Sequence, residues 1–139
     1  MQNQSTEQLS AKPTITSEYI KNAIKTESRD FDKIQARFTE ENIRLLHSTI
    51  GLATEAGEAL DAVKKHLYYG KPLDKTNLKE EMGDLFWYLA IMADVLEVDF
   101  AEVMHNNIEK LKARYGEKFS DQKAIERDLT TERKILEKI

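Results

Sequence analysis

The 139-residue chain contains no cysteine, which excludes disulfide bonds, thiolate nucleophiles and cysteine-ligated zinc sites. No apolar run approaches the ~18 residues of a membrane span, and the polar N-terminus lacks the apolar core of a signal peptide. The chain also lacks the positive charge typical of nucleic-acid-binding proteins, because its formal net charge is −4. We therefore expect a cytoplasmic protein whose partners include neither a membrane nor a nucleic acid.

Residues that interrupt helices are scarce, with only two prolines and five glycines. Apolar residues make up 40% of the chain and charged residues 33%, the composition of a helical protein of one domain. Apolar positions recur every three or four residues in several stretches. The sequence therefore predicts an all-α fold, an antiparallel helical bundle, with helices over 39–68, 77–97, 100–115 and 122–137.

The chain divides at about residue 16. Residues 1–16 are polar and lack periodicity, so we expect a disordered or loosely held tail. Residues 17–139 are expected to form a single all-α domain, with a charged C-terminal helix at 122–137.

The stretch Leu78–Val98 is apolar on almost every side of the expected helix. Trp87, Ile91 and Val95 widen its apolar surface beyond what one neighbouring helix covers. A helix of this kind is usually buried on more than one side. We therefore expect the bundle to be completed by dimerisation through this helix.

Two pairs of carboxylates are spaced three residues apart on neighbouring predicted helices: Glu55 with Glu58, and Glu81 with Asp84. Residues at this spacing lie on one face of a helix, about 5–6 Å apart at Cβ. On antiparallel neighbours the two pairs can converge on one point, and such oxygen donors suit Mg²⁺. The alternative is that Glu55 and Glu58 belong to a solvated face, away from the apolar positions of their helix. Small residues such as Gly51 on the Glu55 side would let another helix or a ligand approach closely.

A second group of polar residues, Asn107, Lys110 and Arg114, follows one side of the predicted helix 100–115. The two cations can neutralise phosphate oxygens, arginine through its planar fork and lysine as a point charge. The alternative is an interhelical hydrogen bond from Asn107 and two cations that extend to solvent.

Three further side chains lie near the first acidic pair or beside Asp84. Lys65 follows Glu58 by two turns and can reach a phosphate, although a solvated lysine is the commoner case. His47 lies on the Glu58 side of its helix, and the ring of Trp87 can stack on a base or belong to the core or an interface.

The acidic pairs and the polar helix occur as Glu55-Ala56-Gly57-Glu58, Glu81-Met82-Gly83-Asp84 and Asn107-x-x-Lys110-x-x-x-Arg114. This pattern resembles the MazG-like all-α nucleoside triphosphate pyrophosphohydrolases over about residues 38–119, which the resemblance makes the catalytic core. The resemblance implies Mg²⁺-dependent cleavage, with Mn²⁺ as an alternative ion, of a nucleoside triphosphate to its monophosphate and pyrophosphate. It also implies a homodimer or a dimer of dimers.

By motif position, the resemblance makes Glu55, Glu58, Glu81 and Asp84 the metal ligands, with Glu55 or Glu58 also activating the attacking water. It places Asn107, Lys110 and Arg114 where the family contacts phosphates or sugar.

Two other functions stay open at this point. The chain can be a pyrophosphohydrolase of the phosphoribosyl-ATP type, or a non-catalytic dimeric helical module that mediates interactions.

Overall fold

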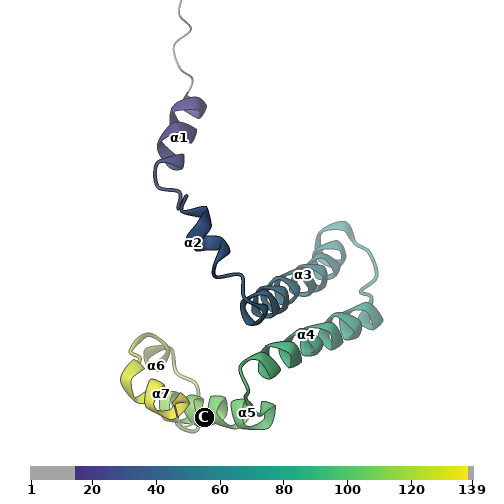
Figure 1. The fold of residues 1–139 in the computed structure, drawn as a ribbon. Helices are drawn as coiled ribbons and strands as arrows, with labels where there is room; N and C mark the ends of the chain where they lie inside the picture. Colours follow the sequence, from purple (N-terminus) through teal and green to yellow (C-terminus); the bar gives the residue numbers. More distant parts are fainter. Residues whose placement is uncertain (1–14, 138–139) are drawn as a thin grey trace, which may run out of the picture. The chain divides into compact units, whose positions relative to one another are not determined.

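The structure is a computed structural model that describes residues 15–137, and in this part of the chain it contains helices and no strand (Figure 1). The all-α fold class is thereby confirmed. No helix among these residues is long and apolar enough to cross a membrane. The chain forms two units, one up to Arg37 and one from Phe38 onward.

The first unit contains α1 (Ile15–Ile24) and α2 (Phe31–Gln35). The second unit contains α3 (Glu40–Tyr69), α4 (Lys75–Val95), α5 (Phe100–Tyr115), α6 (Asp121–Ile125) and α7 (Leu129–Leu136). The tail expected at 1–16 lies mostly outside the described residues, but Ile15 and Thr16 already belong to α1.

The ends of the three long helices are set by capping residues. Thr39, Asp74 and Asp99 accept hydrogen bonds from backbone amides in the first turns of α3, α4 and α5. Gly70 ends α3 in the left-handed conformation with φ 66, which glycine adopts without steric cost. Because Asp74 caps α4, that helix begins two residues before the predicted start at 77.

The C-terminal helix expected over 122–137 is instead two short helices, α6 and α7, and that prediction was wrong. The interruption covers residues 126–128, where the backbones of Glu126 and Asp128 leave the helical conformation, and Asp128 caps α7. Its side chain accepts hydrogen bonds from the amide of Thr131 at 3.0 Å and from the Thr131 hydroxyl at 2.7 Å. A helix start of this kind competes with a continuous helix through the same residues.

Helices α3 and α4 form an antiparallel hairpin that contains most of the tertiary contacts of the second unit. The face of α3 that lies against α4 carries small residues, with Ser48 and Gly51 buried. The ring of Tyr88 lies directly over Gly51. Arg44 also forms an ion pair with Asp94 across the hairpin. The small-residue face therefore makes the close helix contact that the sequence suggested.

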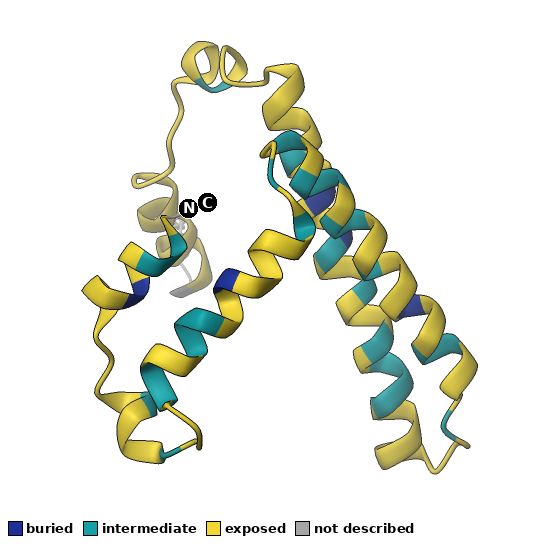
Figure 2. Ribbon diagram, turned by 90° about the horizontal axis from the view of Figure 1, so that it is seen from below, coloured by how far each residue is buried: buried dark blue, intermediate teal, exposed yellow. Residues whose placement is uncertain are grey.

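Large apolar side chains remain accessible throughout the described part of the chain, where no hydrophobic residue is fully buried (Figure 2). On α3, the outer positions Ile50 and Leu60 are 53% and 68% exposed. On α4, Phe86 and Trp87 are 53% and 54% exposed. Within one chain, the nearly all-apolar helix α4 is thus covered by α3 on one side only.

Replacing Gly51 with alanine tests the close approach of the two helices. A Cβ at this position would overlap the Tyr88 ring, so we expect Gly51→Ala to lower the free energy of unfolding by about 1–3 kcal/mol. At Gly57 on the same helix, a Cβ would meet nothing within 4 Å, and Gly57→Ala should raise stability by up to ~1 kcal/mol. Urea unfolding at one protein concentration compares them, and equal stabilities would contradict the packing described.

Candidate functional site

Three carboxylates from the two arms of the hairpin meet at one point. Glu55 comes from α3, and Glu81 and Asp84 come from α4. One oxygen from each of the three lies within 4.8 Å of the others. Glu81 is only 4% exposed, Glu55 is half-buried and Asp84 is exposed. The close packing at Gly51 makes this convergence possible, because Glu55 follows Gly51 by one turn on the same helix.

Glu58 lies one turn beyond Glu55 on α3 and is exposed. It is not part of the group of three, but it lines the same pocket as Glu81. Three of the four predicted metal ligands therefore converge, and the fourth borders them.

The electrostatics of this cluster are unfavourable in the free protein. Partial burial raises the pKa of Glu55, and the negative charge of nearby Glu58 raises it further. The hydrogen-bond donors that reach the cluster are neutral. Asn77 Nδ2 donates to Glu81 Oε1 at 2.6 Å, and Thr54 Oγ1 donates to Glu55 Oε1 at 3.3 Å. Like charges held this close, with one largely buried, are stabilised by a cation.

The donor set fits a hard divalent cation. All the converging ligand atoms are carboxylate oxygens, the type that Mg²⁺ and Mn²⁺ accept. The exposed position of Asp84 leaves room for water or a substrate oxygen to complete the coordination.

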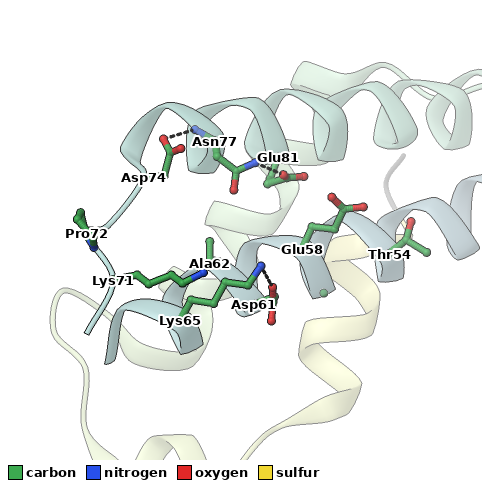
Figure 3. Close-up of a pocket in the computed structure, with 11 residues that line it drawn as sticks. Thr54, Glu58, Asp61, Ala62, Lys65, Lys71, Pro72, Asp74, Asn77 and Glu81 are labelled. Carbon is green, nitrogen blue, oxygen red and sulfur yellow. Dashed lines mark hydrogen bonds and ion pairs between the residues drawn. The ribbon is translucent and has the colours of Figure 1, made fainter. Parts of the chain in front are cut away.

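A pocket of about 830 Å³ extends from this cluster toward the loop that joins α3 and α4 (Figure 3). Its lining includes Glu58, Asp61, Lys65, Lys71, Asn77 and Glu81. Lys65 Nζ forms an ion pair with Asp61 Oδ2 at 2.5 Å, and Lys64 binds the other oxygen of the same carboxylate. The hydrogen bonds from Lys64 and then Lys65 lower the pKa of Asp61 to about 2.

Three aromatic rings lie on the other side of the acidic cluster. His47 meets Trp87 and Tyr88 edge-on, with ring centroids 6.2 and 5.7 Å apart, and Trp87 meets Tyr88 at 4.8 Å. Tyr88 follows Asp84 by one turn of α4. The structure therefore gathers His47 and Trp87 around Tyr88, one turn of α4 from Asp84, and Trp87 is half-exposed.

The predicted phosphate-binding residues of α5 do not line this pocket. Asn107 is exposed and Lys110 is half-buried, and no residue of α5 lines the pocket. The neighbouring Asn106 is buried instead of Asn107. The side chain of Arg114 is held by Glu132 of α7, a residue that the sequence pattern did not single out.

Glu132 is the centre of a buried ion-pair cluster. Arg114 binds it through two hydrogen bonds, Nε to Oε1 at 2.7 Å and Nη2 to Oε2 at 2.5 Å. Arg127 Nη2 donates to Oε2 at 2.7 Å. These hydrogen bonds, first from Arg114 and then from Arg127, lower the pKa of Glu132 to about 2, and the carboxylate raises the pKa of Arg114. Local sequence gave no signal, because Glu132 lies 18 residues from Arg114.

This ion-pair cluster should make stability depend on pH. The folded-state pKa of Glu132 lies below its ordinary value of 4.5, so its contribution is complete above pH 4.5 and disappears as the pH falls toward 2. We expect Glu132→Gln to reduce the free energy of unfolding at pH 7 and to differ less from the wild type at pH 3. Glu137→Gln, which removes an exposed ion pair with Arg133, is the control and should change little. Urea unfolding at both pH values measures this, and a pH-independent difference would contradict it.

Comparison with known proteins gives a family match over residues 45–119, to the MazG nucleotide pyrophosphohydrolase domain. The Gene 37 protein of Mycobacterium phage L5 is 36% identical to this chain over 74 residues, which are 50% of this chain and 65% of the phage protein. This chain thus spans slightly less than two thirds of that relative. No solved structure matches this chain. The matched range includes all four carboxylates and Arg114 but ends before Glu132.

Proposed function

The chain belongs to the MazG nucleotide pyrophosphohydrolase family, and we propose that it cleaves a nucleoside triphosphate to the monophosphate and pyrophosphate. The observation that carries this proposal is the convergence of Glu55, Glu81 and Asp84 within the matched range. The family generally uses a divalent metal. We propose Mg²⁺, with Mn²⁺ as an alternative, and a cytoplasmic role in controlling the nucleotide pool.

In the proposed reaction, Glu55, Glu58, Glu81 and Asp84 hold the metal and the residues around them orient the substrate. When bound, the metal supplies charge neutralisation for the triphosphate. Glu55 or Glu58 accepts a proton from a water molecule whose oxygen attacks the α-phosphorus. The bond from the α-phosphorus to the bridging oxygen breaks, and pyrophosphate leaves with the electron pair.

We assign the remaining predicted residues to substrate contacts. Lys65 lines the pocket beside the carboxylates and is proposed to contact phosphate oxygens. His47 and Trp87 present aromatic rings on the opposite side, where a base can stack.

The residues of α5 carry a separate part of the proposal. Asn107, Lys110 and Arg114 do not line the pocket of their own chain, so we propose that they contribute when the protein assembles. For Arg114 this contribution requires its guanidinium to leave Glu132.

We also propose that the protein is a homodimer or a dimer of dimers. The support is the apolar surface of α4, where Met82, Phe86 and Trp87 are all more than half exposed, as is the C-cap residue Leu96. Removing such a surface from water is favourable, and the same face of a second chain would cover it.

Light scattering measures this assembly directly. We expect a mass that is a multiple of the 16.1 kDa chain at micromolar concentration. Phe86→Asp on the outer face of α4 should shift the distribution toward smaller species, because it places a charge in the apolar contact. A wild-type protein that remains a 16.1 kDa monomer would rule out the proposed assembly.

A panel of substrates tests the proposed reaction. Ribonucleoside and deoxyribonucleoside triphosphates and phosphoribosyl-ATP are incubated with the full chain and Mg²⁺, and pyrophosphate is measured. We expect release from one or more triphosphates and none after addition of EDTA. Release from phosphoribosyl-ATP alone would replace the proposed substrate. If no pyrophosphate is released and Mg²⁺ does not raise the melting temperature, the non-catalytic helical module is favoured instead. The exposed apolar surface of the chain supports that alternative as well.

Neutral substitutions in the acidic cluster separate a metal site from structural ion pairs. We expect Glu81→Gln and Asp84→Asn to reduce turnover on the order of 10²-fold or more, because an amide is a poor Mg²⁺ ligand. In EDTA the same variants should be as stable as the wild type or more stable, because like-charge repulsion is relieved.

Glu80→Gln is the matched control for this series, since Glu80 is an exposed neighbour on the same helix. Glu55→Gln and Glu58→Gln complete it, each assayed for pyrophosphate release and melted in EDTA. Full activity in any two of the four cluster variants would refute the proposed metal site.

A further inference from the structure

We propose that the pocket between the acidic cluster and the α3–α4 loop binds the terminal diphosphate of the substrate, and that Lys71 is its principal contact. This inference rests on the proposed function and adds a binding residue that the sequence motifs do not contain. Lys71 and Lys65 both line the pocket, and Figure 3 shows their side chains extending into it from the loop and from α3.

The backbone of Lys71 is held at the edge of the pocket. Its amide donates to the Lys65 carbonyl at 3.2 Å, and its own carbonyl lies 2.8 Å from Nδ1 of His66. The left-handed Gly70 turns the chain into this position, and Pro72 restricts the conformation of the residue before it. The side chain therefore starts from a fixed point and lies over the end of α3.

The two lysines differ in the partners they already have. Lys65 is bound to Asp61, which it shares with Lys64. Lys71 takes part in none of the ion pairs that the structure records among residues 15–137. A lysine without a counter-ion at a pocket wall can bind an anion without first breaking an ion pair.

The order of groups along the hairpin matches the order of groups in a nucleoside triphosphate. On α3, His47 precedes Glu55 by eight residues and Lys65 follows it by ten, which correspond to about 12 and 15 Å of helix. On α4 the order is the same in the opposite chain direction, from the pocket residue Asn77 through Glu81 to Trp87. If the α-phosphorus lies at the acidic cluster, the base can lie on the side of His47 and Trp87. The diphosphate then lies on the side of Lys65.

The charge of the pocket makes diphosphate binding depend on a cation. Its lining contains four carboxylates, Glu58, Asp61, Asp74 and Glu81, against the two lysines, so the formal sum is −2. An anion alone is not attracted to such a pocket. With a divalent cation at the acidic cluster the balance changes, and we expect pyrophosphate to bind with Mg²⁺ and only weakly without it.

Calorimetric titration of the full chain with pyrophosphate tests this assignment. In Mg²⁺ we expect the wild type to bind and Lys71→Ala to weaken binding by about tenfold, because one charge-assisted contact is lost. Lys71→Arg should retain most of the affinity. Lys79→Ala, which removes an exposed lysine of α4 outside the pocket, should bind within about twofold of the wild type. Thermal melts verify that each variant is folded.

The result also separates this inference from the proposed function. If the wild type releases pyrophosphate from triphosphates but Lys71→Ala binds pyrophosphate as tightly as the wild type, the assignment of Lys71 is overturned and the reaction stands. If no triphosphate is cleaved but pyrophosphate binds in a manner that depends on Mg²⁺ and Lys71, the binding pocket stands and the reaction fails. A wild type that neither binds pyrophosphate nor cleaves a triphosphate overturns both.

Discussion

The close contact between Tyr88 and Gly51 is the constraint on which the arrangement of the candidate site depends. The aromatic ring occupies the space that any Cβ at Gly51 would need, so α3 and α4 approach each other closely there. Glu55 follows one turn later on the same face of α3 and therefore faces Glu81 and Asp84. A larger residue at position 51 would separate the helices and, with them, the carboxylates.

This packing has an electrostatic cost that a bound cation would offset. The helix contact brings together three carboxylates, and it leaves Glu81 almost without access to solvent. The neutral donor of Asn77 orients one oxygen of Glu81 but does not neutralise its charge. A hairpin that holds unneutralised acids in place is suited to binding a cation, because the coordinating oxygens are positioned before the ion arrives.

The helix contact also decides which apolar residues stay exposed, and a separate ion pair connects the C-terminal helices to α5. Small residues such as Ser48 and Gly51 occupy the contact between α3 and α4, and several large apolar residues of both helices, among them Ile50 and Phe86, remain exposed on the outside. Farther along the chain, Glu132 joins α7 to α5 through Arg114. An arginine of the family-matched range is thereby tied to a segment that lies beyond that range.

The sequence by itself determined the three long helices to within two residues at each end, since capping by Thr39, Asp99 and Gly70 depends only on neighbouring residues. It did not reveal the break between α6 and α7. It also identified both acidic pairs, because their three-residue spacing is a local property of a helix. Tertiary structure decided the rest. It decided that Glu58 lies outside the group of Glu55, Glu81 and Asp84, and that Lys65 and Lys71 line the pocket. It also decided that Arg114 binds Glu132. These arrangements depend on contacts between residues that are distant in sequence, and local periodicity does not specify such contacts.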